Sequence, residues 1–161
     1  INKNVNKAVQ YFLLAANQND PNAQYKLGSL YFHGQYLQKD LGKAFHYFCL
    51  SADQNNSDAQ FFLGLFYKNG IYINRDIQKA INYFKLSANQ NNPDAQFSLG
   101  NIYLEGKYIL KNIKEAILYY TLAANQNHPR AQFNLGNIYD NGIDIPRDLD
   151  KAIKYYTLAA N

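Results

Sequence analysis

The dipeptide Ala-Gln occurs four times in this chain, and each copy begins 36 residues after the previous one. The same interval separates the copies of Leu-Gly that follow it, and of a tyrosine and a second glycine further along. A fixed interval of roughly 20 to 50 residues is typical of a solenoid, in which each unit buries its apolar face against its neighbours. The four copies begin at Ala23, Ala59, Ala95 and Ala131.

Each unit is predicted to contain two helices, A and B, joined by a loop of about five residues. In the second unit, Asn56 is the predicted N-cap of helix A, which ends at Gly70 after about twelve residues. Helix B follows Asp76, with apolar residues from Ile77 to Ala88 at helical spacing. The predicted A caps are Asp20, Asn56, Asn92 and His128, and the B caps are Asn4, Asp40, Asp76, Asn112 and Asp148.

The units predict one domain over residues 1–161, with a half repeat at 1–19 and repeats at 20–55, 56–91, 92–127 and 128–161. The chain starts with Ile1 rather than methionine, which suggests an excised segment, and a B helix stands at each end. Terminal repeats normally carry a polar outer face, but neither end shows one, and we expect Val5, Val9 and Phe12 to be partly exposed. We therefore expect either further repeats in the parent protein or end-to-end self-association through the uncapped terminal helices.

The pattern Ala-Gln-Tyr-x-Leu-Gly-x-x-Tyr-x-x-Gly, a loop, then Asp-x-x-Lys-Ala-x-x-Tyr-Phe-x-x-Ala-Ala resembles the Sel1-like repeat, a relative of the tetratricopeptide repeat. The resemblance covers essentially the whole chain. It implies an all-α fold, an α/α superhelix built as a right-handed solenoid of antiparallel helix pairs, with helix A on the concave side. It also implies a non-catalytic adaptor for protein partners. One departure is Gln-Asn after the terminal Ala-Ala, as in Asn17-Gln18-Asn19, where the family often has glycine.

Positions that differ between the copies are candidates for specific contacts, because stacking explains the positions that are identical. On helix A the differing positions form one stripe at i, i+4, i+7 and i+11, which the family's geometry would turn toward the concave groove. The predicted partner-binding residues are Lys26, Ser29, His33, Phe62, Leu65, Asn69, Ser98, Asn101, Glu105, Asn134, Asn137 and Asn141.

Phe62 and Leu65 replace polar residues of the other copies, so they could form an apolar patch in a polar groove. Asparagine amides can both donate to and accept from an extended peptide backbone. We hypothesise that a peptide lies along the groove with an apolar residue near Phe62. The alternative is that Phe62 and Leu65 simply pack on an adjacent helix. The loop residues Tyr36, Tyr72, Tyr108 and Asp144 form a second candidate surface.

Other functions find less support in the sequence. The three histidines fall at three different repeat positions, no metal-ligand spacing or phosphate-binding loop is present, and neither enzymatic activity nor a cofactor is expected. Cys49 cannot form an internal disulfide, and the repeat pattern places it as an ordinary outer-face residue. The alternative function is an RNA-binding helical-repeat protein, but the net charge of +4 is mild and the stripe mixes acidic with basic residues. We therefore expect no nucleic-acid partner. No apolar run is long enough to span a membrane, and the localisation stays open.

Overall fold

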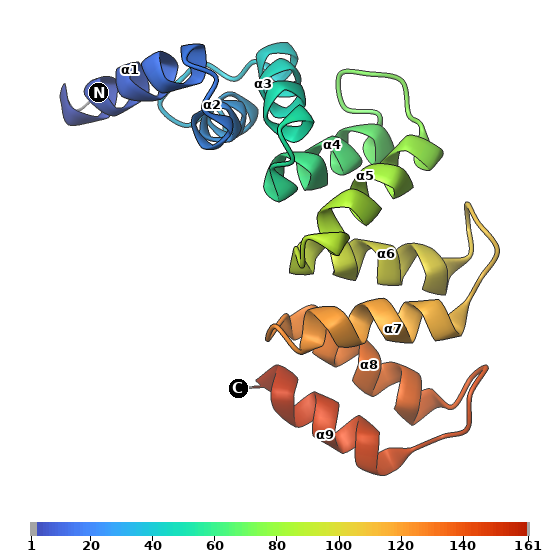
Figure 1. Cartoon of the computed structure of the whole chain (residues 1–161). Helices are drawn as coiled ribbons and strands as arrows, with labels where there is room; N and C mark the ends of the chain where they lie inside the picture. The colour runs from blue at the N-terminus through green and yellow to red at the C-terminus, as the bar shows by residue number, and fades with distance from the viewer. Residues whose placement is uncertain (1–2, 161) are drawn as a thin grey trace. The chain divides into compact units, whose positions relative to one another are not determined.

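The computed structural model describes residues 3–160, and the side chains of residues 7–160. This part of the chain contains nine helices and no strand, which confirms the predicted all-α repeat architecture (Figure 1). The chain divides into two compact units, residues 1–87 and 88–161, which are described separately below. The B helices are α1 (Lys3–Asn17), α3 (Leu41–Asp53), α5 (Ile77–Asn89), α7 (Ile113–Ala124) and α9 (Leu149–Ala160). The A helices are α2 (Pro21–His33), α4 (Ser57–Asn69), α6 (Pro93–Glu105) and α8 (Pro129–Asn141).

The predicted caps set the ends of the A helices. In α2 the Asp20 carboxylate accepts a hydrogen bond from the backbone N–H of Ala23 at 2.7 Å, and Asn56 and Asn92 act in the same way on α4 and α6. His128 caps α8 through Nδ1, which accepts from the backbone N–H of Ala131 at 3.1 Å. Each A helix ends at the predicted glycine in the left-handed conformation: Gly34, Gly70, Gly106 and Gly142.

The predicted B caps hold for four of the five helices. The Asp40 carboxylate accepts a hydrogen bond from the backbone N–H of Lys43 at 2.9 Å. The side chains of Asp76, Asn112 and Asp148 likewise accept from the backbone N–H three residues later. The prediction of a cap at Asn4 is wrong, because α1 already begins at Lys3.

An asparagine supplies the turn between each B helix and the next A helix. The turn residue adopts a left-handed conformation, with φ between 60° and 66°. Asparagine tolerates this conformation better than most residues that carry a Cβ. It therefore replaces the glycine that is frequent in the family at this turn. The four turn residues are Asn19, Asn55, Asn91 and Asn127.

The glutamine of each Ala-Gln dipeptide is buried and binds the preceding B helix. Gln132 donates through Nε2 to the carbonyl of Ala124 at 3.2 Å, a group at the end of α7 that has no partner within its own helix. Gln24, Gln60 and Gln96 make the same bond to Ala16, Ala52 and Ala88. A turn glutamine adds a second amide contact, since Gln126 Nε2 donates to Gln96 Oε1 at 2.8 Å. The recurrence of Ala-Gln therefore reflects a hydrogen bond between consecutive helices.

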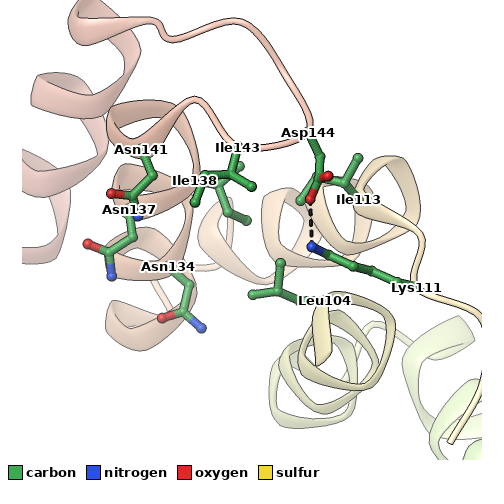
Figure 2. Close-up of a pocket in the computed structure, with 9 residues that line it drawn as sticks. All are labelled: Leu104, Lys111, Ile113, Asn134, Asn137, Ile138, Asn141, Ile143 and Asp144. Atoms are coloured by element: carbon green, nitrogen blue, oxygen red, sulfur yellow. Dashed lines mark hydrogen bonds and ion pairs between the residues drawn. The ribbon is translucent and has the colours of Figure 1, made fainter. Parts of the chain in front are cut away.

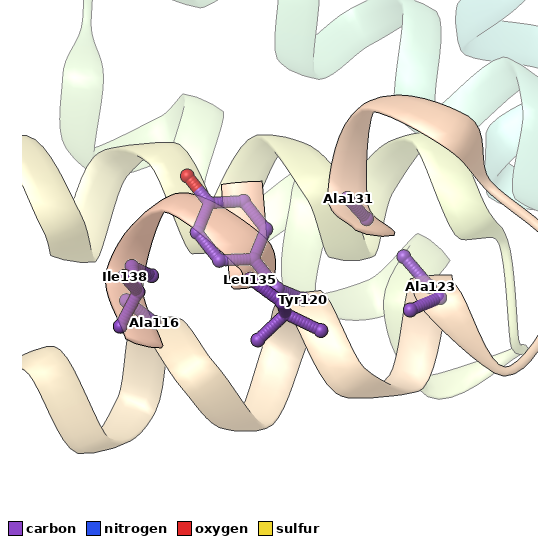
Figure 3. Close-up of a cluster of buried hydrophobic side chains, with 7 residues drawn as sticks. Ala116, Tyr120, Ala123, Ala131, Leu135 and Ile138 are labelled. Atoms are coloured by element: carbon purple, nitrogen blue, oxygen red, sulfur yellow. The ribbon is translucent and has the colours of Figure 1, made fainter. Parts of the chain in front are cut away.

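A glycine on each A helix faces an aromatic ring on the B helix that follows. A Cβ placed on Gly100 would lie 2.6 Å from the Tyr120 ring, so only glycine allows this close approach. Tyr120 is fully buried, and Figure 3 shows it beside Leu135 and Ile138 of α8. The four glycine–ring pairs are Gly28 with Phe48, Gly64 with Phe84, Gly100 with Tyr120 and Gly136 with Tyr156.

The terminal helices differ in how far they are covered. In α1, Val9 is only 8% exposed, so its expected exposure is wrong. Phe12 is partly exposed as expected, and it packs on the cluster formed by Ala16, Ala23 and Leu27. The side chain of Val5 lies outside the described residues. In α9, by contrast, Leu149 and Ile153 are 50% and 63% exposed. The expected self-association through the ends stays a prediction.

Replacing Gly64 with alanine is expected to lower the free energy of unfolding by about 1–3 kcal/mol, because the new Cβ would lie 2.5 Å from the buried Phe84 ring. Gly42→Ala is the control. Its Cβ would lie 3.2 Å from the ring of the exposed Tyr72, which can move, and alanine favours the helix by about 0.5–1 kcal/mol. Urea unfolding of both variants checks this, and equal losses would contradict the importance of the close approach.

Asn127→Ala is expected to lower the free energy of unfolding by about 1 kcal/mol, because alanine is strained in the left-handed conformation that Asn127 adopts. Asn127→Gly removes that strain and should unfold close to the wild-type temperature. Thermal unfolding followed by circular dichroism compares the two variants. If the glycine variant is no more stable than the alanine variant, backbone conformation does not explain the asparagine.

Candidate functional site

A cavity of about 190 Å³ opens beside α8 in the second unit (Figure 2). Asn134, Asn137 and Asn141 line it from one face of α8, and all three belong to the predicted stripe. The remaining wall is largely aliphatic and comes from α6, α7, α8 and the loop after α8. The aliphatic lining residues are Leu104, Ile113, Ile138 and Ile143.

The charged groups of this cavity neutralise one another. Lys111 Nζ lies 2.6 Å from Asp144 Oδ2, and the two side chains come from the loops after α6 and α8. They are 47% and 43% exposed, so the pair stands at the edge of the cavity. Asp144 belongs to the predicted loop surface, but Lys111 was missed. A basic residue precedes the B cap in each repeat, at Lys39, Arg75, Lys111 and Arg147, and this was the signal for it.

Two asparagines of the stripe share a hydrogen-bond network with a core tyrosine. The hydroxyl of Tyr120 donates to Asn101 Oδ1 at 2.6 Å, and Asn134 Nδ2 donates to the same oxygen at 3.4 Å. Burial raises the pKa of Tyr120 to about 12; a hydrogen bond from Asn134 opposes that rise, and the charge of Glu105 adds to it. The phenol therefore stays protonated at neutral pH and remains a hydrogen-bond donor.

A similar contact recurs one repeat later. The hydroxyl of Tyr156 donates to Asn137 Oδ1 at 2.8 Å. Burial raises the pKa of Tyr156, and the nearby Asp140 carboxylate raises it further, so this phenol is also protonated at neutral pH. The stripe is thus hydrogen-bonded to a helix B tyrosine at two successive positions, to the buried Tyr120 and to the partly exposed Tyr156.

Variation along the stripe follows the identity of the core ring. The B-helix ring lies 19 residues after the stripe position, and a tyrosine there occurs with asparagine on helix A. Where the ring is phenylalanine and has no hydroxyl, the stripe position is not asparagine. The pairs are Ser29 with Phe48, Leu65 with Phe84, Asn101 with Tyr120 and Asn137 with Tyr156. Differences between copies at this position therefore have a structural cause within the repeat.

In the first unit the stripe contains a phenylalanine that packs on other aromatic rings. Phe62 stacks on Phe48, with ring centroids 4.7 Å apart, and meets Phe32 edge-on at 5.5 Å. Phe62 is partly exposed and packs on α2 and α3. This packing agrees, for Phe62, with the alternative interpretation of the sequence. Leu65 and Ser29 are also partly exposed, and Lys26, His33 and Asn69 are exposed. In the second unit Glu105 is exposed, whereas Ser98 is only 8% exposed.

A further repeated feature, which the sequence analysis missed, is a stacked tyrosine pair within each repeat. Tyr67 and Tyr83 stack with ring centroids 5.6 Å apart, and they line a cavity of about 490 Å³ in the first unit with Lys79 and Asn82. The pairs are Tyr31–Tyr47, Tyr67–Tyr83, Tyr103–Tyr119 and Tyr139–Tyr155. A tyrosine at both positions of every repeat was the available signal.

The part of the chain that the structure describes holds no group of three or more His, Cys, Asp or Glu side chains arranged to bind a metal ion. No described helix is long and apolar enough to cross a membrane. Burial raises the pKa of the Cys49 thiol to about 11, so this thiol is protonated and a weak nucleophile at neutral pH.

The Asn101–Tyr120 pair predicts a specific double-variant result. Asn101→Leu leaves the buried Tyr120 hydroxyl without its acceptor, and we expect the free energy of unfolding to fall by about 1–3 kcal/mol. Adding Tyr120→Phe should recover most of this loss, because the double variant recreates the Leu65–Phe84 pair of the second repeat. Urea unfolding of the two single variants and the double variant completes this double-mutant cycle. Additive losses would show that the two positions are independent.

The family model for the Sel1 repeat matches residues 1–20, 21–56, 57–92, 93–128 and 129–161. A Sel1 repeat protein from Oxalobacter formigenes is 32% identical, with a TM-score of 0.90 over 96% of this chain and 63% of that one. The protective antigen c5321 of uropathogenic Escherichia coli is 32% identical, with a TM-score of 0.89 over 94% of this chain and 32% of that one. Cysteine rich protein B of Helicobacter pylori is 29% identical, with a TM-score of 0.62 over 80% of this chain and 92% of that one. The chain thus spans less than two thirds of the first two, and no curated protein matches it.

Proposed function

Because the chain belongs to the Sel1 repeat family, we propose that it is a non-catalytic scaffold that binds a protein or peptide partner along the stripe of its A helices. Proteins with Sel1 repeats generally mediate protein–protein interactions. The proposed contact residues are the predicted stripe residues of each unit except Ser98, which is only 8% exposed, together with Lys111 and Asp144 at the edge of the cavity in the second unit.

The observation that carries this proposal is the cavity beside α8. It joins three amide side chains of the stripe to an aliphatic floor, which is the combination of apolar pocket and polar surround typical of peptide-binding sites. Burying one aliphatic side chain of a partner there would contribute about 1.5–3 kcal/mol. The amides would add orientation through hydrogen bonds.

The proposal is tested by selecting binders from a random peptide display library against the whole chain. Selected peptides should lose most of their affinity for Ile143→Gln, because Ile143 is 65% exposed and lines the cavity. They should bind Leu118→Gln normally, because Leu118 is also exposed, at 50%, but lies on α7 and does not line the cavity. Calorimetry measures both affinities.

Two outcomes would contradict the proposal. One is a library that yields no specific binder, and the other is a set of binders that treats the two glutamine variants alike. The salt dependence of binding separates the RNA alternative. Peptide binding through an apolar cavity should change little with salt, whereas nucleic-acid binding would fall steeply as counterions compete.

A further inference from the structure

Hydrogen bonds within the second unit hold the amides of Asn101, Asn134 and Asn137. We propose that the surface formed by Asn101, Asn134, Asn137 and the adjoining cavity recognises the backbone of an extended peptide that carries one uncharged aliphatic side chain, with Tyr120 as the residue that positions the amides. This inference rests on the proposed function and specifies its ligand.

Tyr120 fixes the first amide. Its hydroxyl is buried and protonated at neutral pH, and it donates to Asn101 Oδ1 at 2.6 Å. The oxygen of the Asn101 amide is therefore turned toward the core. Only the oxygen of Asn101 takes part in this contact, so its two Nδ2 hydrogens are assigned to a ligand.

The second amide has the opposite orientation. Asn134 Nδ2 donates to Asn101 Oδ1 at 3.4 Å, which directs the NH₂ group of Asn134 toward Asn101. The side of Asn134 that is left for a ligand is its carbonyl oxygen. Asn101 and Asn134 together offer one donor and one acceptor, which complement the C=O and the N–H of a peptide backbone.

Asn137 adds a second donor one turn further along α8. Its Oδ1 accepts from the Tyr156 hydroxyl at 2.8 Å, so its Nδ2 takes no part in that bond and is assigned to a ligand. Asn137 also lines the cavity, which links the hydrogen-bonding surface to the aliphatic floor. A peptide bound to these amides would therefore have a side chain within reach of that floor.

The chemistry of the cavity selects an uncharged side chain. The charged lining residues are Lys111 and Asp144, which pair with each other at 2.6 Å. A charged side chain in this place would lose its water without gaining a free counter-charge, which costs free energy. The same neutrality offers no cationic surface to a phosphate backbone, so a peptide fits the site better than a nucleic acid.

The first unit lacks this arrangement. Its core rings, Phe48 and Phe84, carry no hydroxyl, and the matching stripe positions are Ser29 and Leu65. Phe62 packs there on Phe48 instead of offering an amide. Backbone recognition by oriented amides is therefore assigned to the second unit alone.

The test uses the whole chain and the acetylated, amidated peptide Ala-Ala-Leu-Ala-Ala, titrated to millimolar concentration. The side-chain amide resonances of Asn101, Asn134 and Asn137 should shift saturably in NMR spectra. Tyr120→Phe should weaken binding by about 2- to 12-fold, the loss expected from one misplaced hydrogen bond. Tyr119→Phe is the matched control, because Tyr119 stacks on Tyr103 and should leave the affinity unchanged.

Two changes in the peptide separate the backbone from the side chain. N-methylation of the leucine nitrogen removes the N–H that Asn134 would accept, and leucine-to-aspartate places a charge in the cavity, so both should weaken binding. The Asn101→Leu, Tyr120→Phe double variant should fold, as circular dichroism would show, and still bind weakly. A merely structural role of Tyr120 would change stability but not the response to N-methylation.

Each remaining outcome decides against the inference. If the pentapeptide binds and neither Tyr120→Phe nor N-methylation weakens it, the amides do not read the backbone. If the pentapeptide fails to bind while library-selected peptides bind at Ile143, the inference falls and the proposed function stands. If neither kind of peptide binds, both fall together.

Discussion

The contact on which the other features of this repeat depend is the approach of a helix A glycine to an aromatic ring of helix B. A Cβ at Gly100 would come within 2.6 Å of the Tyr120 ring, so the two helices can cross at this distance only without a side chain there. The ring fills the space that the glycine leaves, and close-packed interiors tolerate little change in that volume. Because the ring stands at the crossing, its para position reaches the stripe on helix A. The para substituent therefore decides what the stripe must carry.

This connection makes the surface of each repeat depend on its core. A phenylalanine ring ends in a carbon atom and places no demand on helix A, so Leu65 is acceptable beside Phe84. A tyrosine ring ends in a buried hydroxyl, which is costly without a partner, and Asn101 satisfies the hydroxyl of Tyr120 at 2.6 Å. The tyrosine oxygen thus goes with asparagine at this stripe position, where the phenylalanine repeats carry serine or leucine. Two successive tyrosines, Tyr120 and Tyr156, bond to asparagines of the second unit's stripe, while in the first unit the stripe residue Phe62 stacks on Phe48.

Much of the fold follows from local sequence, because caps and left-handed glycines act within a few residues of their own helix. Asp20, Asn56 and their equivalents were predicted as caps on that basis, and the failure at Asn4 reflects a helix that starts earlier than the cap pattern implies. The Asn101–Tyr120 bond joins residues 19 apart on different helices, which no local rule describes. The sequence does show that the positions of Asn101 and Tyr120 change together from repeat to repeat. Each position considered alone, however, suggests variation without a structural constraint. Similarly, the near-complete burial of Ser98 depends on neighbours from other helices.

The variable positions of these repeats therefore fall into two kinds, those that vary alone and those that vary together with a core residue. Some positions vary without a matching change in a core residue, and the packing of the core does not constrain them. Asn141 and its counterparts His33, Asn69 and Glu105 are an example. A position that varies together with a core residue carries a structural requirement first. The two kinds are not exclusive, because the hydrogen bond that satisfies Tyr120 uses only the oxygen of the Asn101 amide and leaves its Nδ2 donors out of that bond. A side chain whose orientation is already fixed loses less conformational entropy when a ligand binds. The core demand that explains Asn101 is thus also what would make it an effective contact for a partner.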